Sequence, residues 1–258
     1  ELRQQYEFDR AVSVYENILS DEENEADAYW GIVLCRYGIE YVEDPRTSDM
    51  IPTCHRASYK SLLNDENYKK ALYYADDEKR KLWTEEAERL DNLLKVVLAE
   101  ASRQNQYEIF ICYKENDGDG NRTEDSVIAH EIYNALEKEG YHVFFAPKSI
   151  SYGSAYEPYI FSALHSSRLM FVIGTKTEYF EAPWVRNEWA RFLELIQDGK
   201  EKTLIPLYKN MEPENGMPKE LVRLQSYNLD TLGYIQDICD AAAKILGRKA
   251  RQTAAPGA

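Results

Sequence analysis

Tyr107-Glu108-Ile109-Phe110-Ile111-Cys112-Tyr113 is the stretch that decides the fold predicted for this chain. Its apolar run is short and almost unbroken, which is typical of a strand that is covered on both faces of a sheet. The next segment, Thr123–Glu139, predicts a helix that is capped by Thr123 and stopped by Gly140. A strand followed directly by a helix is the repeating unit of a parallel α/β sheet.

The same alternation continues toward the end of the chain. Further strands are predicted at residues 142–145, 169–174 and 204–208, and further helices at residues 154–165, 184–196 and 232–246. This order predicts an α/β fold with a doubly wound parallel sheet. Ligands of such sheets bind outside the carboxyl ends of the strands, so we expect a site in the loops after Tyr113, Phe145 and Gly174.

Residues 1–105 follow a different pattern, with apolar residues at helical spacing, and predict an all-α region. We expect a loop from Asp44-Pro45 to Ala57 and one long amphipathic helix, Asp77–Gln104. The first forty residues resemble parts of two adjacent tetratricopeptide repeats (TPR). The chain is therefore divided into a TPR-like assembly or sensing region (1–105), an α/β domain (106–247) and a flexible tail (248–258).

The composition excludes several kinds of partner. The net charge of the 258 residues is −14, and acidic residues outnumber basic ones on both sides of residue 105. General binding to nucleic acid or to an anionic membrane is therefore not expected. The four cysteines lack the spacing of a metal site or a disulfide framework, so no metal is predicted. Without a signal peptide or a membrane-spanning run, the composition favours a reducing cytoplasm.

Trp184-Val185-Arg186-Asn187-Glu188 contains the candidate site. The preceding Pro183 suits the first turn of a helix, where its missing N–H is no loss. Trp184 and Glu188 are four residues apart, so both project from one face of that helix. This pair could stack a planar base and hold a ribose beside it. The alternative from spacing alone is that Trp184 covers the sheet edge and Glu188 is a solvated surface charge.

Several segments resemble Toll/interleukin-1 receptor (TIR) domains. Residues 107–113 resemble the aromatic-Asp-Val-Phe-Ile-Ser-Tyr motif of the opening TIR strand, with Cys112 in place of the serine. Residues 140–145 resemble the second strand, and Ala146 to Gly153 fall where the BB loop of the family lies. This loop lacks the Arg-Asp…Pro-Gly form of animal receptor TIR domains, which argues against a receptor-adaptor surface of that type.

Trp184 and Glu188 match the Trp-x-x-x-Glu pattern of TIR domains that cleave NAD, and the chain resembles the prokaryotic members of this type. The resemblance implies an NAD glycohydrolase or cyclase that yields nicotinamide and ADP-ribose or a cyclic isomer, with NAD as the substrate and no cofactor. In these enzymes the glutamate of the pattern is the essential carboxylate, which here is Glu188. The remaining matching positions imply a set of substrate-binding residues: Trp184, Tyr113, Lys114, Phe145 and Gly153.

The same resemblance implies activation by self-association of TIR domains, with the helical region setting or sensing assembly, also with other proteins. Prokaryotic relatives of this kind serve in antiviral defence, which is the pathway expected here. Two other functions stay open at this stage. One is a non-enzymatic scaffold that acts through TIR–TIR contacts. The other is a nucleoside or nucleotide transferase that uses the same carboxylate on another base–sugar bond.

Overall fold

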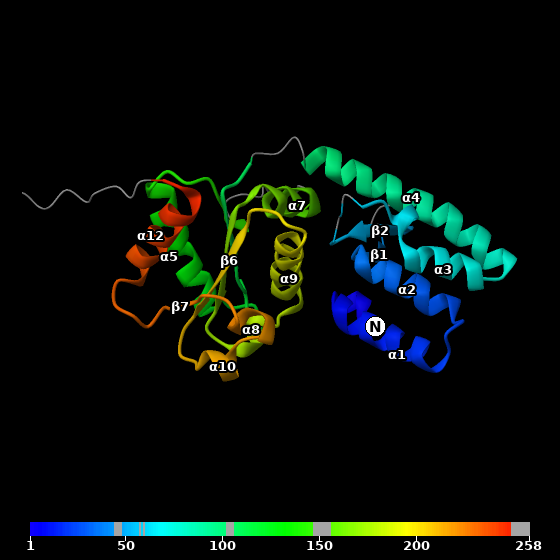
Figure 1. The fold of residues 1–258 in the computed structure, drawn as a ribbon, viewed down its shortest axis with the longest axis horizontal. Helices are drawn as coiled ribbons and strands as arrows, with labels where there is room; N and C mark the ends of the chain where they lie inside the picture. The colour runs from blue at the N-terminus through cyan, green and yellow to red at the C-terminus, as the bar shows by residue number, and fades with distance from the viewer. Residues whose placement is uncertain (44–47, 57, 59, 102–105, 147–155, 249–258) are drawn as a thin grey trace, which may run out of the picture. The chain divides into compact units, whose positions relative to one another are not determined.

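The computed structural model describes residues 1–43, 48–56, 58, 60–101, 106–146 and 156–248 (Figure 1). The chain divides into two compact units, one of residues 1–104 with 155–161 and one of residues 105–154 with 162–258. No helix in the described part of the chain is long and apolar enough to cross a membrane.

The first unit contains the helical region that the sequence predicts. Its helices are η1 (Arg3–Gln5), α1 (Phe8–Asp21), α2 (Ala26–Arg36), η2 (Leu62–Asn64), α3 (Glu66–Tyr74) and α4 (Asp77–Ala101). The core of the unit forms around the stacked indoles of Trp30 and Trp83, whose ring centroids are 5.6 Å apart. The long helix α4 buries the apolar stripe that starts at Trp83 and continues through Leu90 and Leu94.

The predicted loop between residues 44 and 57 is partly wrong, because it contains the strand β2 (Met50–Cys54), which pairs antiparallel with β1 (Ile39–Glu43) just before the loop. The two prolines of the region favoured a loop, yet Pro52 pairs with Tyr41 within the hairpin. Proline is tolerated there because each strand of a two-stranded sheet has a free edge that needs no N–H donor.

The second unit is built on a five-stranded sheet, which confirms the predicted doubly wound parallel fold. Its strands lie in the order β4-β3-β5-β6-β7, and all neighbouring pairs are parallel. The strands are β3 (Ile109–Cys112), β4 (Val143–Phe144), β5 (Leu169–Gly174), β6 (Thr203–Tyr208) and β7 (Tyr227–Asn228). Only the two-residue β7 was not predicted, since so short a strand leaves no periodic signal.

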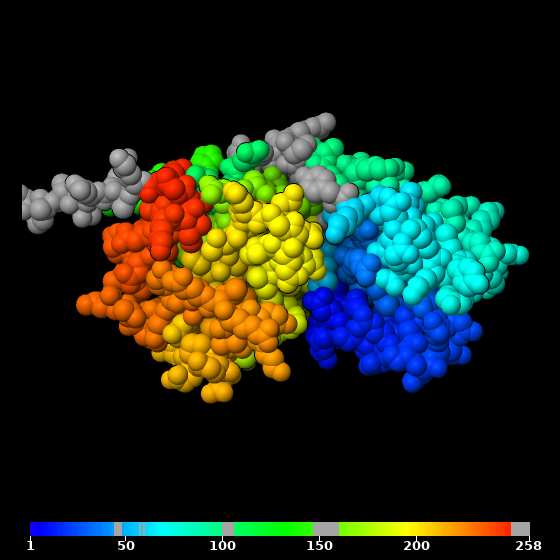
Figure 2. Space-filling view, viewed as in Figure 1, coloured from blue at the N-terminus to red at the C-terminus, as the bar shows by residue number. Residues whose placement is uncertain are grey.

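Helices cover both faces of this sheet. In Figure 1, α5 (Glu124–Lys138) and α12 (Tyr234–Leu246) lie on one side of β6, and α9 (Pro183–Gln197) lies on the other. The remaining helices of the α/β region are α7 (Tyr156–Ser166), α8 (Thr177–Phe180), α10 (Pro213–Gly216) and α11 (Lys219–Val222). The segment that carries α10 and α11 lies at the surface of the unit (Figure 2, orange).

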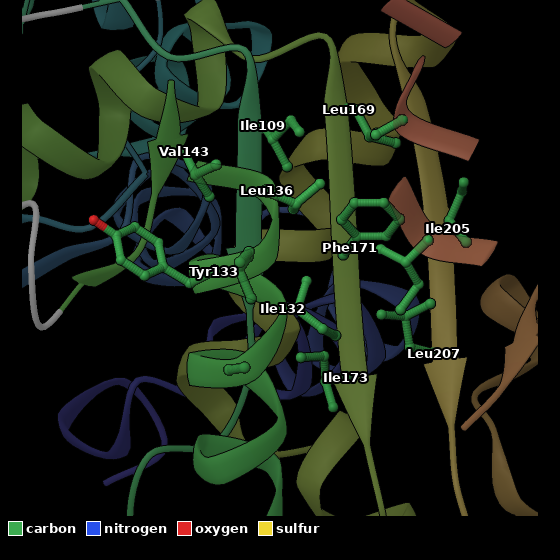
Figure 3. Packing of buried hydrophobic residues seen from close by; sticks show 14 of the residues in the cluster. Ile109, Ile132, Tyr133, Leu136, Val143, Leu169, Phe171, Ile173, Ile205 and Leu207 are labelled. Carbon is green, nitrogen blue, oxygen red and sulfur yellow. The ribbon is translucent and has the colours of Figure 1, made fainter. Parts of the chain in front are cut away.

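The face under α5 and α12 holds a hydrophobic core of the second unit (Figure 3). Ile132 and Leu136 of α5 point toward the side chains of β3 and β5, such as Ile109 and Phe171. Both predicted ends of α5 are confirmed. The Thr123 hydroxyl accepts a hydrogen bond from the Ser126 N–H at 3.1 Å, and Gly140 takes a positive φ of 83° directly after the helix.

Arg248, the first residue of the tail that the sequence predicts, makes several contacts with the second unit. Its Nη2 donates to both carboxylate oxygens of Glu108 at 2.7 Å, and its Nη1 donates to the Gly140 carbonyl at 2.8 Å. The guanidinium also lies 4.4 Å from the centroid of the Tyr141 ring. Residues 249–258 of the predicted tail lie outside the described residues.

Gly174→Ala is expected to destabilise the second unit by about 1–3 kcal/mol, because the new methyl group overpacks the end of β5. A Cβ at Gly174 would lie 2.3 Å from the Phe180 ring. Urea unfolding checks the change, with Gly118→Ala as the control, since a Cβ there meets nothing within 4 Å. Equal losses of stability in the two variants would contradict the packing argument.

Candidate active site

Helix α9 places a carboxyl group where its neighbours are apolar. The residues that it buries include Val185, Glu188, Trp189 and Phe192, which recur at the spacing of a core-facing stripe. The Trp189 indole N–H donates to the Phe180 carbonyl at 2.9 Å and fixes this stripe at its centre. Glu188 is therefore not the solvated surface charge that spacing alone allowed, because only 9% of its surface is exposed.

Burial is the main influence on the Glu188 carboxyl and raises its pKa to about 8. Hydrogen bonds with the side chains of Cys112 and Trp184 favour the charged form and lower this pKa in part. Trp184 is half-buried, and it lies on the same helix face as Glu188, as the sequence predicts. At neutral pH the Glu188 carboxyl is thus mostly protonated.

The topology of the sheet explains why this position matters. Cys112 is the last residue of β3 and pairs with Val172 of the neighbouring β5. The chain passes from β3 to β4 at one side and then returns to β5 at the other, so the winding reverses between β3 and β5. Open α/β sheets bind ligands in the crevice at such a reversal. Glu188 contacts Cys112 and therefore lies at this point of the sheet.

A second buried carboxyl lies at the same strand ends. Asp125, near the start of α5, is fully buried, and its Oδ1 accepts a hydrogen bond from the Thr175 N–H at 2.8 Å. Burial raises the Asp125 pKa to about 6, although the hydrogen bonds from Thr175 lower it. Its Oδ2 has no hydrogen-bond partner among the described residues. The sequence analysis missed Asp125, because an aspartate in the first turn of a helix is ordinary.

Two predicted substrate-binding residues lie on the other face of the sheet. Tyr113 stacks on Phe145 with ring centroids 5.5 Å apart, and Phe145 in turn stacks on Tyr133 at 4.8 Å. The His130 ring meets the edge of this stack at 5.6 Å, and Phe145 is only 1% exposed. The structure thus brings Tyr113 and Phe145 together on the α5 face.

The structure says less about the other two predicted substrate contacts, Lys114 and Gly153. Lys114 follows β3 and is half-buried, and its carbonyl accepts a hydrogen bond from the Thr123 hydroxyl. Its ammonium forms no ion pair with any residue that the structure describes. Gly153 and all of the predicted BB loop after Ala146 lie outside the described residues. Within the described ranges, no group of three or more His, Cys, Asp or Glu side chains could hold a metal ion.

The second unit is a flavodoxin-like α/β domain. It has a buried carboxyl group at the point where the winding of its sheet reverses. The family model for the TIR domain matches residues 109–244, which is more than half of the chain. The chain therefore belongs to the TIR domain family, as the sequence analysis expected. No curated protein matches it.

Among solved structures, the chain is similar to the TIR domains of the activated Roq1 resistosome, which recognises the effector XopQ. The identity is 14% over 54% of this chain and 99% of that chain, with a TM-score of 0.43. It is also similar to a TIR-STING receptor from C. gigas in complex with 2',3'-cGAMP, at 20% identity over 53% of this chain and 39% of that chain, with a TM-score of 0.43. A second structure of the C. gigas receptor is similar at 19% identity over 53% of this chain and 40% of that chain, with a TM-score of 0.41.

Glu188→Gln is expected to stabilise the protein at alkaline pH. Folding raises the Glu188 pKa from 4.5 to about 8, so the native protein loses stability as pH rises through this interval. The loss reaches roughly 5 kcal/mol at most, and a neutral glutamine avoids it. Urea unfolding should give equal stabilities near pH 4.5 and a more stable variant near pH 9.

The matched control for this comparison is Glu194→Gln, which changes an exposed glutamate of the same helix. This control should follow the wild-type protein at every pH. If Glu188→Gln also followed the wild type between the two pH values, the buried, protonated carboxyl would be refuted.

Proposed function

We propose that this protein cleaves the bond between nicotinamide and ribose in NAD and acts as an NAD glycohydrolase or cyclase. The observation that carries the proposal is the buried Glu188 carboxyl, held beside Trp184 at the reversal of a TIR-family sheet. A strongly shifted carboxyl at a ligand-binding position of the fold is a recognised mark of a functional site.

The chemistry needs one carboxylate near the ribose. As the C1'–N bond breaks, its electron pair moves to the nicotinamide nitrogen, and the nicotinamide leaves as a neutral molecule. Positive charge then develops on the ribose, and the Glu188 carboxylate stabilises it. Capture by water gives ADP-ribose and releases a proton, whereas capture by a nitrogen of the adenine in the same molecule gives a cyclic isomer.

The raised pKa of Glu188 suits a cationic substrate. The nicotinamide ring of NAD carries a positive charge, and such a charge beside a carboxyl group favours its ionised form. Substrate binding would therefore drive the Glu188 proton into solvent. The carboxylate would then act in a site with little water, where its interaction with the developing charge is strong.

Trp184 has two roles in this proposal. Its indole hydrogen-bonds Glu188 and so orients the carboxyl group. Because the side chain is only half-buried, its remaining surface is available for stacking on a ring of the nucleotide. Tyr113, Lys114, Phe145 and Gly153 stay predicted substrate contacts. None of the four cysteines, all of which the structure describes, forms a disulfide, which supports a reducing cytoplasm as the place of the reaction.

The wild-type chain should release nicotinamide from NAD, and Glu188→Gln should lower this rate by at least about 100-fold, because the charge-stabilising group is lost. Its kcat/KM should rise with pH through about 8, since the free enzyme must lose the Glu188 proton. Chromatography of the products at high protein concentration checks both expectations. The exposed Glu194 of the same helix gives the control variant, Glu194→Gln, which should keep wild-type activity.

Three results would contradict the proposal. Equal release by the wild type and Glu188→Gln would show that the carboxylate lies elsewhere. No release in concentrated samples of folded protein would favour the TIR scaffold. Release of bases from free nucleosides or nucleotides, with NAD left intact, would favour the transferase.

Self-association is the second part of the proposal, and it makes the activity depend on concentration. The nicotinamide released per protein molecule should rise steeply as the protein concentration increases, and it should follow the oligomeric fraction in sedimentation velocity. An activity that switches on with assembly suits the antiviral role expected of the family. A constant specific activity across the range over which the protein associates would refute this part alone.

A further inference from the structure

The Cys112 thiol occupies a position between two acceptors. Its Sγ lies 3.5 Å from the Val185 carbonyl oxygen of α9 and also hydrogen-bonds the Glu188 carboxyl one helical turn further on. The side chain is completely buried, so solvent cannot replace either partner. Burial and the nearby carboxyls of Glu188 and Asp125 raise the pKa of Cys112 well above its ordinary value. The thiol therefore keeps its proton at neutral pH.

A thiol has one proton to donate, and its sulfur is only a weak acceptor. When Glu188 is protonated, its O–H can donate to the sulfur while the S–H donates to the Val185 carbonyl. When Glu188 is ionised, the S–H can turn to the carboxylate instead. The Val185 carbonyl tolerates this loss, since it lies in the first turn of α9, where carbonyls accept bonds within the helix.

We propose that Cys112 is a positioning residue for Glu188: its S–H hydrogen bond switches from the Val185 carbonyl to the Glu188 carboxylate as that carboxylate forms. This proposal rests on the proposed function only for its catalytic meaning, because the hydrogen-bond exchange itself needs no substrate. The thiol proton stays on sulfur throughout. The proton that leaves is that of the Glu188 carboxyl, and it goes to solvent.

The other groups around α9 leave this role to the thiol. The helix packs against β3, β5, β6 and α8. β5 is apolar along its whole length, β6 ends in Tyr208, and α8 carries Glu178 and Tyr179. Burial apart, Cys112 and Trp184 are the described side chains whose hydrogen bonds affect the Glu188 pKa, and Trp184 belongs to α9 itself. Cys112 is thus the hydrogen-bonding partner that the sheet provides for Glu188.

Cys112→Ser and Cys112→Ala should change the pKa of Glu188 in opposite directions. A hydroxyl is a stronger donor than a thiol and favours the carboxylate more, whereas alanine offers no donor. The titration midpoint of Glu188 should therefore fall in Cys112→Ser and rise in Cys112→Ala, each by about half a pH unit or more. Cys239→Ser is the control, because this half-buried thiol lies on α12, which packs with α5.

Infrared titration of the purified protein measures this midpoint without any substrate. The carbonyl band of the protonated Glu188 is assigned by its loss in Glu188→Gln, and the S–H band of Cys112 by its loss in Cys112→Ser. In the wild type, the S–H band should shift as Glu188 titrates, and in Glu188→Gln it should not. Thermal unfolding verifies that each variant is folded, since a purely structural role of Cys112 would change stability and not the midpoint.

The proposal is overturned if Glu188 keeps its wild-type titration midpoint in folded Cys112→Ser and Cys112→Ala, or if both variants shift this midpoint in the same direction. It is also overturned if the S–H band of the wild type does not shift as Glu188 titrates. Nicotinamide release from NAD separates this result from the proposed function. Shifted midpoints without any release would support the role of Cys112 and refute the enzyme. Release with unchanged midpoints would support the enzyme and refute the role of Cys112.

Discussion

The pairing of β3 with β5 is the constraint on which the site depends. Because the winding of the sheet reverses between these strands, α5 and α9 leave them toward opposite faces. Glu188 of α9 therefore reaches the end of β3 from one face, while Asp125 of α5 reaches Thr175 after β5 from the other. Both carboxyl groups raise the pKa of the Cys112 thiol, so the two acids lie near the same pair of strand ends.

Neither Glu188 nor Asp125 forms an ion pair with a described residue, and this affects the ionisation of both carboxyl groups. A lysine or arginine beside Glu188 would hold it ionised at all times, at a pKa below its ordinary range. Burial beside a thiol and an indole does the reverse and raises the Glu188 pKa to about 8. Under the proposed function, a cationic substrate would shift this carboxyl group toward its ionised form.

Local signals in the sequence predicted the sheet and most helices, because caps, stops and periodicity are short-range features. The Thr123 cap and Gly140 are examples. The site was harder to predict. The resemblance placed Tyr113 among the substrate contacts, and the structure stacks its ring on Phe145 within the core on the α5 face. The burial of Asp125 had no local signal, since it depends on Thr175, fifty residues away.

The contacts of Arg248 bear on where a TIR domain can be truncated. Its partners Glu108 and Gly140 lie at the starts of β3 and β4, at the edge of the sheet opposite the site. The family match stops at residue 244, inside the last turns of α12, and the predicted domain stopped at residue 247. A TIR domain cut at either position would lose a two-oxygen ion pair and a cation–π contact together. Arg248 thus contributes contacts to the fold four residues beyond the end of the family match.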